Sequence, residues 1–261
     1  MNISLEGKIA VVCGSTQGIG KAIALSFAES GATCFLVARN EESLKAVLAE
    51  LPVKHGQEHR YFTADFSDVA TVHAVVKQIA GTADVNILVN NTGGPKPGPI
   101  TDAATEDFTN TFSQHIVCNQ LLVQGFLPGM KKQGQGRIIN IISTSTKIPI
   151  ANLGVSNTIR AAVASWAKTL SNEVGQFDIT VNNILPGYTE TVRLDSLIKN
   201  IATNSGSSVE AVTDKLKNEI PMKRFGSAEE LASLATFLAS AQASYITGTS
   251  IAVDGGKTGA L

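Results

Sequence analysis

Three glycines near the amino end of the sequence are spaced in a way that suits phosphate binding. They lie in the segment Cys13-Gly14-Ser15-Thr16-Gln17-Gly18-Ile19-Gly20, which follows an apolar run and precedes a stretch rich in Ala and Leu. Glycines at these positions allow a tight strand-to-helix turn, and they let backbone N–H groups approach a diphosphate at the helix N-terminus. The same glycines also suit a tight turn that binds nothing. Their place between a first strand and a first helix favours a dinucleotide site.

The end of the second apolar run indicates which dinucleotide would bind. A site for NAD usually carries an acid here, about 20 residues beyond the glycines, which binds a ribose hydroxyl. This chain has Ala38-Arg39-Asn40 instead. Because Arg39 can pair with a 2′-phosphate and no carboxylate repels one, the sequence favours NADP(H). The alternative is that Arg39 is a solvated loop charge.

Two further strand ends carry polar residues at the carboxyl edge of the expected sheet, where open α/β sheets bind ligands. The third run ends in Thr63-Ala64-Asp65-Phe66, in which Asp65 either accepts from an adenine amino group or caps the next helix. The fourth run ends in Asn90-Asn91-Thr92-Gly93-Gly94. The proline-rich loop over 93–99 either shapes the substrate site or only connects two elements.

Hydrophobic periodicity predicts the elements that position these residues. Short apolar runs alternate with longer stretches of helical period, which is typical of repeated β-α units around a parallel sheet. We expect an α/β fold, a Rossmann-type doubly wound sheet of seven strands in one domain over 1–261. The expected strands are 8–13, 33–38, 61–64, 85–90, 137–142, 180–185 and 250–253. The expected helices are 18–30, 41–51, 68–81, 105–132, 155–175 and 227–241.

Composition excludes several classes of protein. The chain has 261 residues, 43% of them apolar, which suits one large domain. With 21 basic and 22 acidic residues, it lacks the charge that nucleic-acid binding needs. The cysteines, at positions 13, 34 and 118, are odd in number and read as buried thiols in a reducing compartment. No apolar run is long enough for a membrane span and no leader pattern is visible, so we expect a cytoplasmic protein.

Over nearly its whole length the sequence resembles the short-chain dehydrogenase/reductase family, in the compact form that includes 3-oxoacyl-carrier-protein reductases. The family's Thr-Gly-x-x-x-Gly-x-Gly motif appears with Cys13 in first place, and its Asn-Asn-Ala-Gly motif appears at 90–93 with Thr92 in third place. The resemblance implies a homotetramer or homodimer that binds a nicotinamide dinucleotide. The implied cofactor-binding residues are Gly14, Ser15, Thr16, Gln17, Gly18, Ile19, Gly20, Arg39, Asp65, Phe66, Asn91, Gly93, Arg160, Pro186, Gly187 and Thr191.

The catalytic set departs from the family pattern. In the family, a Ser after the fifth strand polarises the substrate carbonyl, a Tyr farther along supplies the proton, and a Lys four residues later binds ribose and lowers the Tyr pKa. Ser143 matches the Ser, but Ser156 and Arg160 stand where the Tyr and Lys belong. His115 aligns with the family's catalytic Asn. The chain therefore carries Ser-x-x-x-Arg in place of Tyr-x-x-x-Lys.

These replacements alter proton transfer. Ser156 has a far less acidic hydroxyl than Tyr, and Arg160 keeps its proton. A water held by Ser156 could supply the proton, or His115 could, since the pKa of an unperturbed histidine is about 6.5. The alternative is that His115 is only a hydrogen-bonded helix residue. Gly94 and Tyr188 are expected in the substrate pocket, with Tyr188 as its wall or as an acid.

We therefore expect an NADP(H)-dependent oxidoreductase that interconverts a carbonyl and an alcohol on a small molecule. The alternative is a pseudoenzyme that binds dinucleotide and acts as a binding or regulatory protein. The segment at about 190–221 is polar and lacks one clean helical period, so we expect a mobile insertion that serves as a substrate lid. The remaining histidines lack ligand spacing, and we expect no metal.

Overall fold

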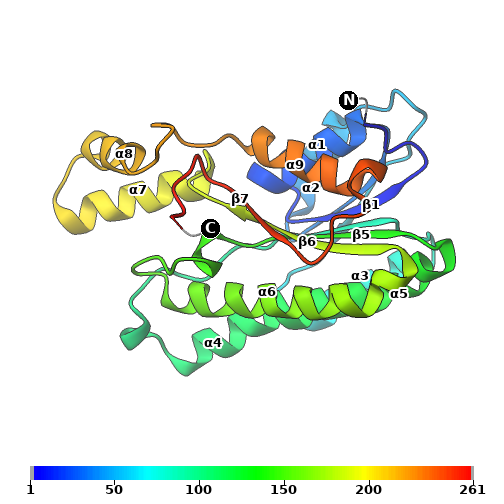
Figure 1. The fold of residues 1–261 in the computed structure, drawn as a ribbon, viewed down its shortest axis with the longest axis horizontal. Helices are drawn as coiled ribbons and strands as arrows, with labels where there is room; N and C mark the ends of the chain where they lie inside the picture. The colour runs from blue at the N-terminus through cyan, green and yellow to red at the C-terminus, as the bar shows by residue number, and fades with distance from the viewer. Residues whose placement is uncertain (1–2, 260–261) are drawn as a thin grey trace.

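The apolar runs form a parallel sheet, seen between two helical layers in Figure 1. The computed structural model describes residues 3–259, so residues 1, 2, 260 and 261 of the expected domain lie outside the described part. The strand order is β3-β2-β1-β4-β5-β6-β7, which confirms the expected doubly wound, seven-stranded sheet. The strands are β1 Ile9–Cys13, β2 Thr33–Ala38, β3 Arg60–Thr63, β4 Ile87–Asn90, β5 Gly136–Ile141, β6 Ile179–Pro186 and β7 Ser250–Val253.

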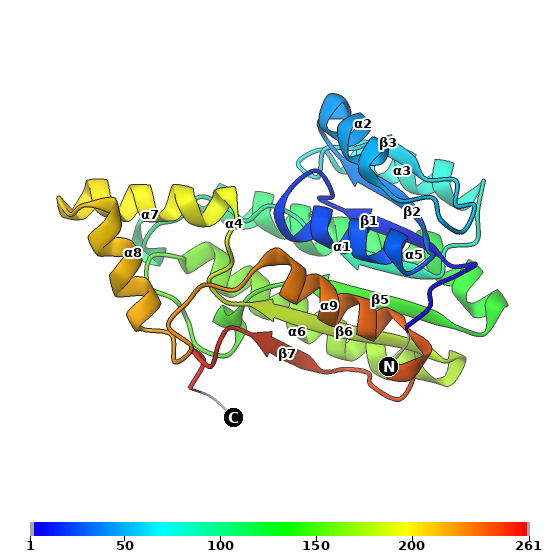
Figure 2. The ribbon, with the colours of Figure 1, turned by 90° about the horizontal axis from the view of Figure 1, so that it is seen from above.

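Helices cover both faces of the sheet, so apolar residues stand at successive positions of central strands such as β1 and β2 rather than at alternate positions. One face carries α1 (Gly18–Glu29), α2 (Glu41–Glu50) and α9 (Ala228–Ala239), and the other carries α3 (Val69–Ala80), α5 (Cys118–Gln133) and α6 (Gly154–Val174), as Figures 1 and 2 show. Successive strand residues point to opposite faces. Val12 therefore packs in the core beneath α1, α2 and α9, which we call the first core. Val11 packs in the core beneath α3, α5 and α6, which we call the second core.

The helical stretch expected over 105–132 is present in the structure and contains a π-helical turn. α4 (Thr105–Phe112) runs into a π-helical turn at Ser113–Val117, and α5 follows directly. A π turn adds one residue to a helical turn and is frequent at functional sites. Here it carries His115, which is buried. The sequence did not indicate the π turn, because the apolar spacing on both sides of it is helical.

The segment at 190–221, in contrast, is more regular than expected. It forms α7 (Val192–Ser205) and α8 (Val209–Asn218), which extend beyond the carboxyl end of the sheet in Figure 2. The two helices are too short for either to show a long apolar period, and the turn between them resets the phase. They share a small apolar core of their own, made by Leu194, Ile198, Ala202, Val212, Leu216, Ile220 and Phe225.

Backbone hydrogen bonds join the segment that enters this helix pair to the segment that leaves it. The Gly226 N–H donates to the carbonyl of Tyr188 at 2.9 Å, and the Glu190 N–H donates to the carbonyl of Gly226 at 2.9 Å. The segments that enter and leave the pair are therefore held side by side. We call residues 190–221 the α7–α8 pair.

The three cysteines are buried and free, as expected. Within residues 3–259, no helix has both the length and the apolar character that crossing a bilayer requires.

Candidate active site at the carboxyl edge of the sheet

The glycine loop packs too closely against β4 for any side chain to fit. A Cβ at Gly20 would lie 2.1 Å from the carbonyl oxygen of Gly14, and one at Gly14 would lie 2.6 Å from the carbonyl oxygen of Asn91. Asn91 Nδ2 donates to the carbonyls of Cys13 and Gly14, at 3.3 and 3.2 Å. Gly14 also has a positive φ of 59°, which favours glycine. The loop therefore presents bare backbone at the edge of the sheet.

This loop offers polar groups that lack protein partners. The Ser15 hydroxyl is fully buried without a hydrogen-bond partner among the described residues. The first turn of α1, preceded by Thr16 and Gln17 and containing Ile19, has no acidic residue and no side-chain cap. Backbone N–H groups at such a helix start suit a diphosphate. The residues present therefore fit a dinucleotide.

The segment after β6 closes the other side of the glycine loop. A Cβ at Gly18 would lie 3.1 Å from Cγ2 of Thr191, which caps α7 by accepting from the Leu194 N–H. Pro186 ends β6, and the Gly187 N–H donates to the carbonyl of Val253 at 3.0 Å. Gly18 and Thr191, which are far apart in sequence, are thus brought together at the carboxyl edge of the sheet.

Arg39 and Asp65 lie at the carboxyl ends of the neighbouring strands β2 and β3. The Asp65 carboxylate accepts from the backbone N–H and the hydroxyl of Ser67, at 2.9 and 2.8 Å. These bonds, with a smaller effect from the exposed Arg39, hold the pKa of Asp65 below its usual value. The helix α3 is capped by Asp68, so the alternative in which Asp65 caps it is wrong. Phe66 is partly buried against the second core.

Ser143 follows the end of β5, and Ser156 and Arg160 lie in the first turns of α6. Ser143 Oγ accepts from the Ser145 N–H at 3.0 Å, and Ser156 is buried one helical turn before Arg160. Arg160 Nη1 donates to the carbonyl of Ile141 at 2.8 Å, and Nη2 donates to that of Thr92 at 3.3 Å. Arg160 thus ties the ends of β4 and β5 together. Burial lowers its pKa to about 10, which leaves it charged at neutral pH.

His115 lies against the segment that follows β4. Its Nδ1 is 2.5 Å from Oγ1 of Thr92, whereas its Nε2 is buried without a partner among the described residues. Burial lowers the pKa of His115 to about 2, and the charges of Arg160 and Arg193 act in the same direction. The expectation of an ordinary histidine pKa was therefore wrong. His115 is a neutral imidazole, which can donate one hydrogen bond and accept another.

Arg193 was not predicted as a site residue from the sequence. In the structure it places a second guanidinium at this edge. It lies in the first turn of α7, and a Cβ at Gly94 would lie 2.4 Å from its Nη2 atom. Tyr188 instead joins the core of the α7–α8 pair. Its ring packs edge-on against Phe225 with centroids 6.1 Å apart, and burial raises its pKa.

A family model described as enoyl-(acyl carrier protein) reductase matches residues 14–258. The chain belongs to the short-chain dehydrogenase/reductase family. The NADPH-dependent reductase BacG of Bacillus subtilis (strain 168) is 36% identical over 255 residues, which cover 97% of this chain and 98% of that protein. The 3-oxoacyl-acyl-carrier-protein reductase FabG of Aquifex aeolicus (strain VF5) is 33% identical over 259 residues, which cover 98% and 99%.

Solved structures of the family agree with this membership. The L-sorbose reductase from Gluconobacter frateurii, complexed with NADPH and L-sorbose, superposes with a TM-score of 0.94, is 34% identical, and is matched over 100% of both chains. YwfH, an NADPH-dependent reductase involved in bacilysin biosynthesis, has a TM-score of 0.92 and is 34% identical over 97% of this chain and 99% of that one. The relatives named here are reductases, so membership of this family supports an oxidoreductase.

A row of buried amides fixes the strand ends that carry this family site. Asn90 Nδ2 donates to Asn140 Oδ1 at 2.8 Å, and Asn140 Nδ2 donates to Asn183 Oδ1 at 2.9 Å. Asn183 Nδ2 then bonds Ser250 Oγ at 3.0 Å. The row crosses β4 to β7 at one level and holds the ends of these strands in place. Thr92 follows the end of β4 and Ser143 follows the end of β5, so both are attached to strand ends that the row fixes. This row was not predicted from the sequence. The pattern that could have indicated it is a polar residue at the matching place in each of several successive apolar runs.

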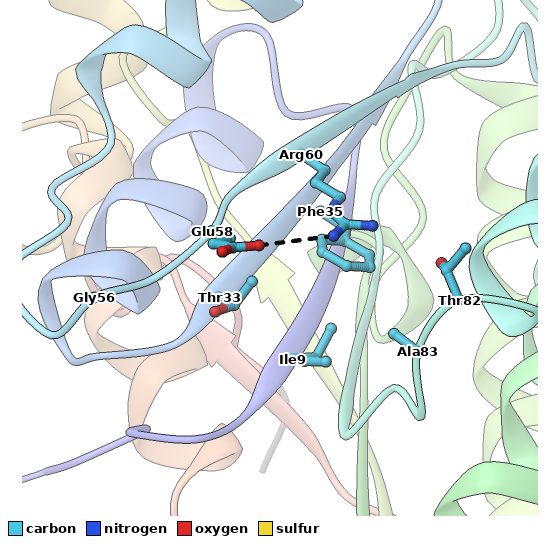
Figure 3. Close-up of a pocket in the computed structure, with 8 residues that line it drawn as sticks. All are labelled: Ile9, Thr33, Phe35, Gly56, Glu58, Arg60, Thr82 and Ala83. Atoms are coloured by element: carbon cyan, nitrogen blue, oxygen red, sulfur yellow. Dashed lines mark ion pairs between the residues drawn. The ribbon is translucent and has the colours of Figure 1, made fainter.

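The pocket in Figure 3 lies at the other end of the sheet. It encloses about 300 Å³ at the amino ends of β1, β2 and β3, and none of the expected site residues lines it. Arg60 lies over the Phe35 ring there, with its Cζ atom 5.7 Å from the centroid, and pairs with Glu58 at 3.8 Å. No group of three or more His, Cys, Asp or Glu within residues 3–259 is arranged to hold a metal ion.

Proposed function

We propose that the protein is an NADPH-dependent reductase that interconverts a small-molecule carbonyl and an alcohol through an altered catalytic site. One observation carries this proposal. Arg160 joins the carbonyl groups of Thr92 and Ile141, beside Ser143 and at the same sheet edge as the glycine loop. The NADPH-dependent relatives support the choice of cofactor.

Different residues of the described chain suit different parts of the cofactor. The glycine loop and the buried Ser15 hydroxyl suit the diphosphate, Arg39 suits the 2′-phosphate and Asp65 suits the adenine. Asn91, next to Gly14, and Thr191, next to Gly18, would border the other half of the cofactor with Gly93, Pro186 and Gly187. Bound NADPH would supply a hydride to the carbonyl carbon.

Ser143 would polarise the substrate carbonyl. Its Oγ already accepts a hydrogen bond from the Ser145 N–H, which leaves its own hydrogen free to donate to the substrate oxygen. Arg160 uses two of its five N–H groups on backbone carbonyls, and the other three are available to ribose and to the developing alkoxide. Preorganised donors of this kind stabilise charge that grows during hydride transfer.

The proton would come through water rather than from a side-chain acid. Ser156 is buried beside Arg160 and has a hydroxyl able to hold a water molecule. His115 is neutral and can orient that water but cannot act as an imidazolium. Loss of a positioned general acid slows such reactions by roughly 10²- to 10⁴-fold. The proposed enzyme is therefore a slow member of its family.

The α7–α8 pair would serve as the substrate lid. It carries Thr191 and Arg193 to the site while the backbone bonds at Tyr188 and Gly226 hold its base. A helical pair joined to the sheet by two short connections can move as one body when substrate enters.

The second candidate is a pseudoenzyme that binds dinucleotide without turnover, and it is favoured by the Ser156 and Arg160 positions. Titration of NADPH by fluorescence, followed by assays on ketones, 3-oxoacyl thioesters and sugars, separates the two. The reductase predicts turnover that falls about 10²-fold or more in Ser143→Ala with unchanged NADPH affinity. Tight NADPH binding without turnover on any substrate identifies the pseudoenzyme. Absence of NADPH binding rules out both.

A further inference from the structure

Two guanidinium groups contact the same short segment after β4. Arg160 Nη2 donates to the carbonyl of Thr92 at 3.3 Å. The guanidinium of Arg193 lies against Gly94, where a Cβ would be 2.4 Å from Nη2 and 2.7 Å from Nη1. The two groups come from different elements, α6 and α7, and both reach the edge where Ser143 lies.

Neither guanidinium has a carboxylate partner among the described residues. The ion pairs within residues 3–259 involve other lysines, arginines and histidines only. Arg160 is 8% exposed, so its charge is removed from water with only carbonyl oxygens as partners. Arg193 is exposed as a residue, but its guanidinium adds positive charge that lowers the pKa of both His115 and Arg160. A site with two such charges favours an anion.

The donors left free match the oxygens of one anionic group. Arg160 keeps three N–H groups, and no hydrogen bond from Arg193 to any described residue is formed. His115 adds a buried Nε2 atom without a partner in the same region. A planar guanidinium binds a carboxylate through two parallel hydrogen bonds, which a neutral substrate group cannot match.

We infer that Arg193, beside the positive charge of Arg160, binds a carboxylate of the substrate, so that the substrate class is ketones that carry an acid group. This inference rests on the proposed reductase function. Because Arg193 lies in the first turn of α7, the bound carboxylate would also hold the α7–α8 pair over the site. The cofactor's diphosphate offers the same chemistry, and the experiment below distinguishes the two sources.

The test compares a 2-oxo acid with its methyl ester, which has the same ketone but no charge. The native enzyme should prefer the acid by about 10- to 100-fold in kcat/KM, the usual effect of a charge-assisted pair. Arg193→Met should remove this preference with NADPH affinity unchanged, and Arg193→Lys should restore part of it. Lys199→Met removes a charge from the exposed face of the same helix and should keep the native preference.

A binding measurement keeps the inference testable apart from turnover. Calorimetry of NADPH-loaded protein should detect benzoate but not the neutral benzamide, and Arg193→Met should weaken benzoate about 10-fold or more. Benzoate binding without turnover on any ketone would contradict the proposed function but support the anion site. Equal use of acid and ester, or equal benzoate binding in Arg193→Met, would overturn the inference. A loss of NADPH affinity in Arg193→Met with benzoate binding intact would assign Arg193 to the cofactor and overturn it too.

Discussion

The Oγ1 atom of Thr92 lies 2.5 Å from Nδ1 of His115, and the carbonyl of the same threonine accepts a hydrogen bond from Arg160. In the family pattern, the Thr92 position carries Ala and the His115 position carries Asn. A hydroxyl has therefore appeared where a buried imidazole needs a partner. The departures at 92, 115 and 160 form one hydrogen-bonded unit, not three separate losses.

Stability should fall in acid because of His115. Its folded-state pKa of about 2 lies below the unfolded value of about 6.5, so the unfolded chain takes up a proton that the folded chain cannot. The stability that the neutral ring provides is present above pH 6.5 and is lost as the pH falls from there toward 2. Between pH 7 and pH 5, we expect the free energy of unfolding of His115→Gln to fall by about 2 kcal/mol less than that of the native protein, as measured by urea unfolding.

A matched histidine serves as the control for this measurement. His73 lies on the exposed side of α3, away from the site, and His73→Gln should keep the native dependence on pH. Equal pH dependence in His115→Gln and the native protein would show that His115 is free to ionise.

Gly20→Ala should destabilise the protein, although alanine is the better helix former. Helix propensity alone predicts a gain of about 1 kcal/mol. The added Cβ would lie 2.1 Å from the carbonyl oxygen of Gly14, so the glycine loop must shift and NADPH binding should be lost. Gly175→Ala has no atom within 4 Å of the new Cβ and should be tolerated. Normal NADPH affinity in Gly20→Ala would contradict the assignment of the loop.

Arg39→Asp should reverse the choice of cofactor. The guanidinium would be replaced by a carboxylate beside the expected 2′-phosphate, so the ratio of NADPH to NADH affinity should fall about 10²-fold or more. Lys77→Asp makes the same change in net charge on α3 at the far side of the sheet and should leave the ratio as it is. An unchanged ratio in Arg39→Asp would place the 2′-phosphate elsewhere.

Restoring the family pair should speed the reaction. Ser156→Tyr with Arg160→Lys returns a positioned acid and a residue that lowers its pKa, and kcat should rise about 10²-fold. Neither single change should give this gain, because the tyrosine needs the lysine and the lysine has no acid to assist. A double variant that binds NADPH as the native protein does but turns over no faster would mean that protons reach the substrate by another route.

Much of the fold followed from local patterns. The glycine loop could be predicted because a short spacing of residues determines both its turn and its place between β1 and α1. The strands of 33–38 and 250–253 were predicted with the bounds that the structure shows. The π turn at Ser113–Val117 could not be predicted, because one added residue hardly changes the apolar pattern around it.

The site itself was only partly predictable. The positions of Ser143, Ser156 and Arg160 followed from motif spacing within one segment of the chain. Arg193 reaches Gly94 across a gap of about a hundred residues in sequence, and no local pattern reports such a contact. The lowered pKa of His115 depends on its burial and on two charges from other elements, so it needed the three-dimensional arrangement.

Isotope transfer from NADPH distinguishes a reductase from a protein that binds the cofactor without turnover. NADPH carrying deuterium at C4, prepared separately with the label on each face, is incubated with the protein and a panel of ketones, including the 2-oxo acids favoured above. A reductase should move one of the two labels, and not the other, to the carbinol carbon of an alcohol product, which adds one mass unit. NADPH that binds tightly but transfers neither label to any ketone would contradict the assignment as a reductase.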